Sequence, residues 1–208
     1  MQINLEDVSF GYGFGSIFKN ITFEFAPQSK TGLLAPNGSG KSTLLALLAK
    51  MLRPNHGQVV LSQGSRPLSK TQYHRQLGIA FGHPYFVFDF TLKQNFVTLQ
   101  ALYNVDATSH LDKLLKLFEL DHHLNTPFKF LSTGQQKKAS LVRAFFHTPQ
   151  CILLDEPTNG LDAKAQDNLI DLINAQSALT IVSSHDRQFL ETATSRSITI
   201  HNQALAHA

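Results

Sequence analysis

The chain has 208 residues, and 42% of them are hydrophobic, which is enough to bury a core and excludes a disordered protein. The formal net charge is +3 at pH 7, with 18 Lys and Arg residues scattered among 15 Asp and Glu residues. No basic run is long enough to follow a phosphate backbone, so we expect no nucleic-acid partner.

The sequence shows neither a targeting segment nor a membrane span. The N-terminal stretch MQINLEDVSFGYG alternates like a strand and lacks the layout of a signal peptide. No apolar run approaches the ~20 residues that cross a bilayer. We therefore expect a soluble, cytoplasmic chain, in which the single cysteine, Cys151, lies in an apolar run and is buried.

Three strands and a helix are expected in the first quarter of the chain. Residues 2–10 and 20–25 alternate apolar with polar residues, as half-buried antiparallel strands do. Residues 31–35 form a short apolar run, and residues 41–52, after a Gly-rich loop, have the few breakers of a buried helix.

The middle of the chain is expected to be helical. The pattern runs from about residue 90 to residue 148, without a flexible linker on either side. Four apolar residues recur at helical spacing behind a cap at Thr108 or Ser109: Leu111, Leu114, Leu115 and Phe118. We predict a helical subdomain at about 84–148, inserted between two parts of one core at about 1–83 and 149–208.

The last third alternates apolar strands with a helix. Residues 150–157 and 178–186 are nearly continuous apolar runs, and residues 162–174 have a helical pattern. This order predicts a mostly parallel sheet covered by helices. The expected fold is a single α/β domain over residues 1–208, with a mixed parallel sheet, an N-terminal antiparallel β subdomain and the inserted helical subdomain.

Residues 35–43, APNGSGKST, follow a predicted strand and open a predicted helix, which is the setting of a phosphate-binding loop. Such a loop directs backbone N–H groups and a helix N-terminus at phosphates. Lys41 is expected to neutralise the β- and γ-phosphates, and Ser42 to bind Mg²⁺. Every nucleotide-contacting position but the opening glycine is present: Asn37, Gly38, Ser39, Gly40, Lys41, Ser42 and Thr43.

Ala35 stands where the pattern has its opening glycine. If this position needs a positive φ, alanine costs on the order of 1 kcal/mol, which weakens a loop without destroying it. We expect nucleotide binding to survive the substitution.

Acidic residues follow the apolar run CILLDEP, at the expected end of a strand. Asp155 is then beside a bound metal ion, and Glu156 is beside a water molecule at the γ-phosphate. His185 follows the apolar run TIVSS, at the edge where open α/β sheets bind ligands. We expect Glu156 and His185 to be catalytic.

The stretch LSTGQ lies at the expected start of another helix. Side-chain hydroxyls and free N–H groups at such a start form an anion site. The candidate residues are Ser132, Thr133, Gly134 and Gln135.

These segments together resemble the nucleotide-binding subunit of ATP-binding cassette (ABC) transporters, in the same order and over essentially the whole chain. Residues 35–43 resemble Walker A, residues 151–156 resemble Walker B, and LSTGQ resembles the LSGGQ signature. Tyr12 resembles the aromatic residue that stacks on adenine, Asp162 lies in a match to the D-loop, NGLD, and His185 resembles the switch histidine.

The resemblance implies an ABC ATPase of the P-loop class, with ATP and Mg²⁺ as cofactors and with Ser42 and Asp155 as the magnesium ligands. It also implies two cassettes packed head to tail, here expected as a homodimer, so that the signature of one closes over the ATP of the other. A transmembrane permease subunit would hold the pair on the cytoplasmic face of the inner membrane. ATP-dependent dimerisation would then drive translocation.

The segment LGIAFGHPYFVFDF departs from the family pattern, because Gly82 and His83 stand where most cassettes have a glutamine that senses Mg²⁺ and couples to the membrane partner. A similar Gly-His pair occurs in cytochrome c maturation haem-export ATPases. Aromatic residues crowd this segment: Phe81, Tyr85, Phe86, Phe88, Phe90 and Phe96. We expect at least half to fill the joint with the helical insertion, and the others to receive an apolar helix of a membrane subunit.

Two alternatives remain open at this point. One is a soluble cassette ATPase that acts on ribosomes or DNA, although such chains usually have two cassettes or a long coiled-coil insertion. The other is a nucleotide-binding regulator that has lost turnover, as Ala35 and the missing glutamine suggest and the retained Glu156 and His185 oppose.

Overall fold

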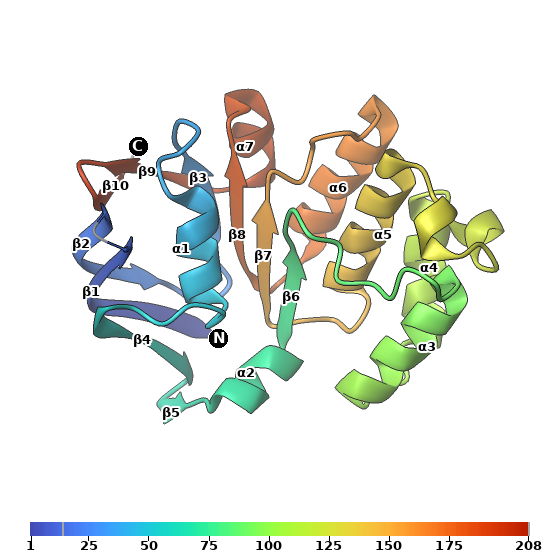
Figure 1. Cartoon of the computed structure of the whole chain (residues 1–208), viewed down its shortest axis with the longest axis horizontal. Helices are drawn as coiled ribbons and strands as arrows, with labels where there is room; N and C mark the ends of the chain where they lie inside the picture. The colour runs from blue at the N-terminus through green and yellow to red at the C-terminus, as the bar shows by residue number, and fades with distance from the viewer. Residues whose placement is uncertain (14, 208) are drawn as a thin grey trace.

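Two β-sheets form one side and the centre of the protein in the computed structural model, which describes residues 1–13 and 15–207 (Figure 1). The first sheet is antiparallel and contains, from edge to edge, β2 (Gly15–Phe25), β1 (Gln2–Tyr12), β4 (His56–Gln63) and β5 (Arg66–Pro67). The second contains β10 (Ala204–His207), β9 (Arg196–His201), β3 (Lys30–Leu34), β8 (Leu179–Ser184), β7 (Cys151–Asp155) and β6 (Leu77–Ala80). Its neighbouring strands are parallel except for β9 and β10, which confirms the mixed sheet and the antiparallel N-terminal subdomain.

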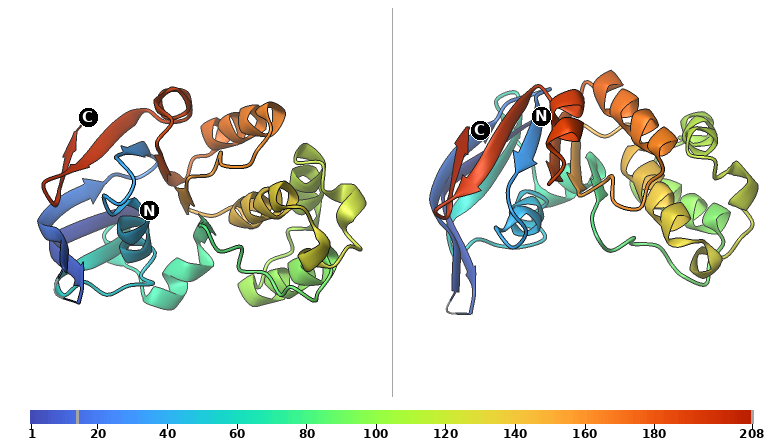
Figure 2. Two further views of the ribbon diagram at one scale, coloured as in Figure 1. Left: turned by 45° about the horizontal axis from the view of Figure 1, so that its top comes forward. Right: turned by 90° about the horizontal axis from the view of Figure 1, so that it is seen from above.

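Helices cover both faces of the second sheet, as Figure 2 shows from two further directions. The helices are α1 (Lys41–Leu48), α2 (Lys70–Arg75), α3 (Leu92–Tyr103), α4 (Thr108–Leu117), α5 (Thr133–Phe145), α6 (Ala163–Ala175) and α7 (Arg187–Ala193), with short 3-10 helices η1 (Asp121–His123) and η2 (Phe128–Phe130). The antiparallel sheet and α1 lie on one side of β7 and β8, and α5 and α6 lie on the other (Figures 1 and 2).

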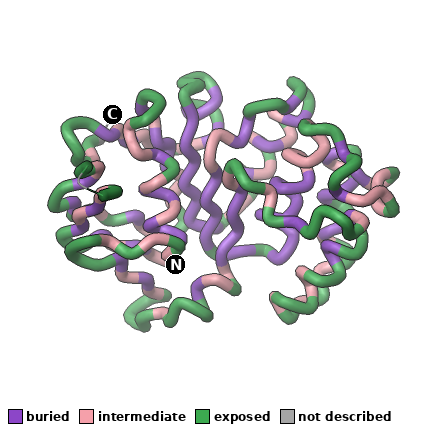
Figure 3. The backbone as a smooth tube through the Cα atoms, in the orientation of Figure 1, coloured by how far each residue is buried: buried purple, intermediate pink, exposed green. Residues whose placement is uncertain are grey.

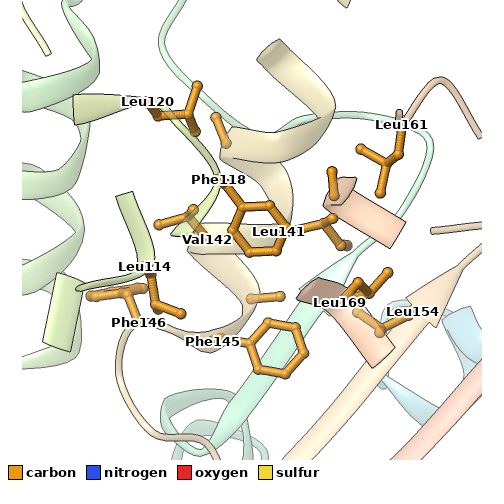
Figure 4. Close-up of a cluster of buried hydrophobic side chains, with 14 of the residues drawn as sticks. Leu114, Phe118, Leu120, Leu141, Val142, Phe145, Phe146, Leu154, Leu161 and Leu169 are labelled. Carbon is orange, nitrogen blue, oxygen red and sulfur yellow. The ribbon is translucent and has the colours of Figure 1, made fainter. Parts of the chain in front are cut away.

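The strand β7 is buried on both faces, because successive side chains of a strand point in opposite directions. Cys151 and Leu153 belong to the core shared with α1 and the antiparallel sheet, and Leu154 belongs to the core shared with the helices α3 to α7. Figure 4 shows part of the second core, where Leu154 lies near Leu169 of α6 and Phe145 of α5. The buried backbone accordingly runs through the central strands in Figure 3. The predicted burial of Cys151 is confirmed.

The helix starts reflect local capping chemistry. Thr91 and Ser132 each cap their helix through a reciprocal box with the glutamine three residues later, which satisfies two otherwise free N–H groups. The expected cap at Thr108 or Ser109 is wrong, because the cap position is Ala107 and its side chain makes no capping bond. Asp106 instead accepts hydrogen bonds from the backbone N–H and the hydroxyl of Thr108.

The helix expected over residues 41–52 is shorter than predicted. It ends at Leu48, and Lys50 just beyond it has a φ of 53°, a left-handed conformation that stops the helical hydrogen-bond pattern. No helix among the described residues is long and apolar enough to cross a membrane.

The end of α5 packs closely on β6, where the helical segment meets the central sheet. A Cβ atom on Gly78 would lie only 1.9 Å from the carbonyl oxygen of Ala144, so this contact requires glycine. The Arg143 guanidinium donates to the carbonyl oxygen of Ile79 at 3.0 Å. His147 follows α5 and is buried, with its ring 4.2 Å from that of Tyr103. Burial lowers the pKa of His147 to about 4, and the charge of Arg143 acts in the same direction.

We predict that His147 makes the fold sensitive to acid. The unfolded chain binds a proton at this imidazole near pH 6.5, whereas the folded chain binds it near pH 4, so the free energy of unfolding falls as the pH is lowered through this interval. The loss is limited to about 3 kcal/mol, at roughly 1.4 kcal/mol per pKa unit. Urea unfolding of the wild type and of His147→Phe at pH 7 and pH 4.5 measures it. An equal loss in both proteins would contradict the prediction.

Candidate nucleotide-binding site

A cavity of about 240 Å³ lies between the β3–α1 loop, the start of β2 and the end of β7. It is lined by Ile17, Asn37, Gly38, Gly40, Lys41, Ser42, Thr43, Asp155 and Glu156. The structure therefore brings together most of the expected phosphate loop and both acidic residues of the CILLDEP segment. This follows from the sheet, because the parallel strands β3 and β7 end at the same edge and flank β8.

The backbone conformation of the β3–α1 loop depends on two glycine residues. Gly38 and Gly40 have φ values of 79° and 102°, which side chains rarely adopt. A Cβ atom on Gly40 would also lie 2.7 Å from Cγ2 of Ile17. Gly40 is the cap residue of α1, no side chain satisfies the first turn, and no acidic residue lies in it. The start of α1 thus suits a phosphate group.

Ala35 does not need the conformation that glycine favours, because its φ is not positive. Its side chain is buried in the core shared with α1, and its carbonyl oxygen accepts a hydrogen bond of 2.7 Å from Lys41 Nζ. The condition under which alanine would strain the loop is therefore not met.

Lys41 is held inside the site by three oxygen atoms. Besides Ala35, it donates to the carbonyl oxygen of Pro36 at 3.3 Å, and its Nζ lies 3.5 Å from Oε1 of Glu156. The side chain is only 6% exposed, so its ammonium group is largely removed from water and interacts strongly with these oxygens.

The carboxylates come from the end of β7 and its following turn. Asp155 accepts a short hydrogen bond from the Ser183 hydroxyl of β8. Glu156 has a φ of 45°, and its Oε2 lies 2.9 Å from Nδ1 of His185, which follows β8. The structure thus brings together Glu156 and His185, the two residues expected to be catalytic, and Ser183 is a further polar residue at this edge that the sequence did not single out.

Among the described residues, two buried oxygen atoms in or beside the cavity make no hydrogen bond: Ser39 Oγ, and Glu156 Oε1, which has only the ion pair with Lys41. Unpaired buried polar atoms are costly, and a polar ligand with its water would satisfy them. Ser42 and Asp155 add two oxygen donors of the kind that Mg²⁺ prefers. No group of three or more His, Cys, Asp and Glu residues within the described chain is arranged to hold a metal. Ser42 and Asp155 as two oxygen ligands fit a cation that takes its other ligands from phosphate and water.

The LSTGQ residues do not line this cavity. Ser132 caps α5, Thr133 and Gly134 open it, and Gln135 completes the capping box. Figure 1 places α5 and α1 on opposite sides of β7 and β8. One chain therefore does not join these residues to its own phosphate loop.

Asp162 lies beside the start of α5 rather than in the cavity. Its Oδ1 accepts from the N–H of Ala165 and caps α6, and its Oδ2 pairs with Lys138 at 2.7 Å. The hydrogen bond from Lys138 is the main cause that lowers the pKa of Asp162, with the Ala165 N–H next. A Cβ atom on Gly134 would lie 3.2 Å from the carbonyl oxygen of Gly160, so the two segments are close neighbours.

Tyr12 also lies outside the lining of the cavity. It ends β1, it is 58% exposed, and its ring packs edge-on against Phe10 with centroids 5.0 Å apart. The stacking of Tyr12 on adenine stays a prediction.

Gly82 and His83, where the sequence departs from the family pattern, are exposed. His83 Nδ1 accepts a hydrogen bond from the N–H of Tyr85 at 3.1 Å. Of the neighbouring aromatic residues, Phe86 and Phe96 are buried, Phe81 is half-buried, and Tyr85, Phe88 and Phe90 are exposed.

A second concavity, of about 440 Å³, lies next to the C-terminal end of α1 and between α2 and α3. We call it the α2–α3 groove, and its residues are Ala49, Met51, Thr71, His74, Arg75, Leu77, Ile79, Leu102 and Tyr103. None of the aromatic residues singled out from the sequence lines it. Periodicity offered no signal for it, because its walls come from three separate segments.

Three features together define a P-loop ATPase: a phosphate loop after a parallel strand, a second strand that ends in acidic residues, and helices on both faces of the sheet. Residues 18–159 match the family model of ABC transporters. The chain belongs to the ABC transporter family, as an ATP-binding cassette that hydrolyses ATP.

Relatives and solved structures agree with this assignment. The zinc import ATP-binding protein ZnuC of Wigglesworthia glossinidia brevipalpis is 28% identical, over 99% of this chain and 85% of that one. YkoD of Bacillus subtilis (strain 168), an ATP-binding protein named for HMP/thiamine import, is 30% identical over 98% of this chain, which spans only 38% of YkoD. The structure of an ATP-binding subunit of an ABC transporter has a TM-score of 0.90 and 24% identity, over 100% of this chain and 90% of that one. A dimeric bacterial ABC transporter cassette has a TM-score of 0.87 and 23% identity, over 99% of this chain and 97% of that one.

We predict that Ala35→Gly leaves ATP affinity within about twofold of the wild type and lowers the free energy of unfolding by about 1 kcal/mol, because glycine adds disorder to the unfolded chain without relieving strain. Gly40→Ala is the contrasting variant. Its strain, on the order of 1–3 kcal/mol, and its clash with Ile17 should weaken ATP binding about tenfold or more. Titration calorimetry and urea unfolding measure both effects. A clear gain of affinity in Ala35→Gly would show that alanine does impair the loop.

Proposed function

We propose that this chain is the ATPase subunit of a transporter whose membrane-spanning part is a separate protein, and that it works as one of two identical cassettes. The observation that carries the proposal is the separation of two half-sites in one chain. The phosphate loop lies on one side of β7 and β8, and Ser132 caps α5 on the other. A second copy, packed head to tail, supplies the missing half of each site.

The phosphate loop binds ATP together with Mg²⁺. Backbone N–H groups at Gly38, Gly40 and the start of α1 hold the phosphates, and Lys41 neutralises them. Ser42 and Asp155 would hold the metal ion, which would polarise the transferred phosphate. The nucleotide forms a hydrogen bond with the buried Ser39 hydroxyl, which makes none within the described residues.

Glu156 and His185 carry out the hydrolytic step from adjacent strand ends. Glu156 accepts a proton from the attacking water, and His185 orients that carboxylate through its Nδ1 and reaches toward the γ-phosphate with the other edge of the ring. On dimer closure the partner's Ser132 and the first N–H groups of α5 add donors to the γ-phosphate. Tyr12 stacks on adenine, and Asp162 with its neighbours completes the contact between the two chains.

The pair is held on the cytoplasmic face of the inner membrane by the membrane partner. We propose the segment 84–148, which contains α3 to α5, as the helical subdomain inserted in the core. The α2–α3 groove lies where this segment meets the sheet. Its apolar residues, with the exposed ring of Tyr85 beside Met51, suit an apolar helix of the partner. The expected partner site thus moves from the aromatic segment alone to the groove.

The shared site predicts an ATP-dependent dimer. In Glu156→Gln, Mg-ATP should be bound without turnover, so light scattering should give a dimer mass with Mg-ATP and a monomer mass without it. Adding Ser132→Ala should leave nucleotide binding to the monomer intact and raise the ATP concentration needed for dimerisation about tenfold, because a donor to the partner's phosphate is lost. Lys41→Ala in the same background is the control without ATP binding.

Two outcomes would contradict this proposal. One is a Ser132→Ala protein that dimerises at the same ATP concentration as its parent. The other is steady-state phosphate release that is equal in the wild type and in Glu156→Gln, which would favour a regulator without turnover.

The groove makes a separate prediction. Leu102→Asp places a charge on an exposed apolar residue of the groove and should abolish co-purification with the membrane fraction, while the ATPase rate of the isolated chain stays within about twofold. Val97→Asp is the matched control, since Val97 is an exposed apolar residue of the same helix outside the groove lining. Equal membrane recovery of both variants would rule the groove out as the docking site.

A further inference from the structure

Glu156 has a backbone conformation that a side chain does not adopt without support. Its φ of 45° lies in the left-handed region, where Cβ crowds the following carbonyl group. Such residues persist only where the surrounding structure fixes them, and they gather at functional sites.

Two other segments of the chain hold the Glu156 backbone. Its N–H donates to Ser183, with the carbonyl oxygen at 3.0 Å and the hydroxyl at 3.2 Å. Its carbonyl oxygen accepts from Nζ of Lys137 at 3.0 Å, and the N–H of Asn159 approaches the same oxygen at 3.4 Å. Lys137 thus contributes the only side-chain donor recorded on this oxygen within the described residues.

Lys137 reaches this oxygen from the helix that begins with the signature. It lies on α5, five residues after Ser132, and its side chain is half-buried. Burial lowers the pKa of Lys137, and the nearby charges of Asp155 and Glu156 act in the opposite direction. Burial thus disfavours the charged ammonium group of Lys137, and the two carboxylates at the end of β7 stabilise it.

The adjacent lysine makes a different contact. Lys138 pairs with Asp162 at 2.7 Å, at the start of α6. Two consecutive residues of α5 therefore fix the two ends of the turn that joins β7 to α6, and only Lys137 bonds to the residue with the catalytic carboxylate.

We propose that Lys137 is a positioning residue that couples the signature end of α5 to the catalytic carboxylate of the same chain. The inference rests on the proposed function, in which Ser132 contacts the ATP of the partner chain while Glu156 acts on the ATP of its own. A shift of α5 on closure moves the Lys137 ammonium group, and the ammonium group moves the Glu156 peptide. The carboxylate then changes its position between Lys41 and His185, which it now contacts at 3.5 and 2.9 Å. Each site thereby senses whether the other is closed.

The test compares Lys137→Met, which keeps the unbranched chain up to Cε but donates no hydrogen bond, with Lys137→Arg, which restores a charged donor. Lys137→Met should lower kcat about tenfold and leave the KM for ATP within about twofold. The variant still binds nucleotide, but its Glu156 carboxylate is no longer held in position. Lys137→Arg should recover most of the lost kcat. Lys116→Met, at an exposed position of α4, is the control and should match the wild type.

A second measurement separates positioning from folding and from dimerisation. Glu156→Gln combined with Lys137→Met should still form the ATP-dependent dimer at about the same ATP concentration as Glu156→Gln alone. A kcat of Lys137→Met within twofold of the wild type would overturn the inference, and so would a loss of turnover that is matched by a loss of the dimer or of the folded state. The proposed function, and this inference with it, would instead be contradicted if the wild type does not hydrolyse ATP and the Glu156→Gln variant does not dimerise with ATP.

Discussion

The Glu156 carboxylate is the point at which the separate parts of this cassette meet. It lies 3.5 Å from Lys41, which begins α1, and 2.9 Å from His185, which follows β8. Its own backbone is bonded to β8 on one side and to α5 on the other. A side chain in the left-handed region is stable only when such contacts over-determine it. The conformation of one residue therefore depends on the relative positions of the phosphate loop, the sheet edge and the signature helix.

The motif residues could be predicted from the sequence because their meeting place follows from topology. Parallel strands bring their carboxyl ends to one edge of the sheet. The motif residues lie at these ends or in the segments that follow them: Lys41, Asp155, Glu156 and His185. The contacts of Lys137 could not be predicted in this way. A lysine in a helical segment carries no sign of what it bonds. The oxygen that accepts the hydrogen bond of Lys137 belongs to a backbone conformation that no local propensity favours.

Element boundaries were less predictable for a similar reason. Strands β4 and β5 and helix α2 were not expected, although Ser69 and Gln72 form the capping box at the start of α2. Strand β4 is stabilised by pairing with β1, and the two-residue β5 by pairing with β4, so tertiary pairing decides these strands more than propensity does. Helix α2 is short and largely polar, and its sequence has little apolar periodicity. The α2–α3 groove was missed for the same reason, since its walls exist only after these elements are in place. By contrast, the buried positions of α4 follow their helical spacing, because one stripe must face the core.

Ala35 illustrates why a pattern position and a structural requirement are different things. In this structure the position contributes a carbonyl oxygen that accepts from Lys41, and any residue supplies that group. The glycines that the loop does need are Gly38 and Gly40, where φ is positive. Lys41 is bound to loop carbonyls and to Glu156, so phosphate must compete with these oxygens for the same ammonium group. In the proposed function, nucleotide binding releases Glu156 from Lys41, and the contact with His185 and the support from α5 become the restraints that remain on the carboxylate.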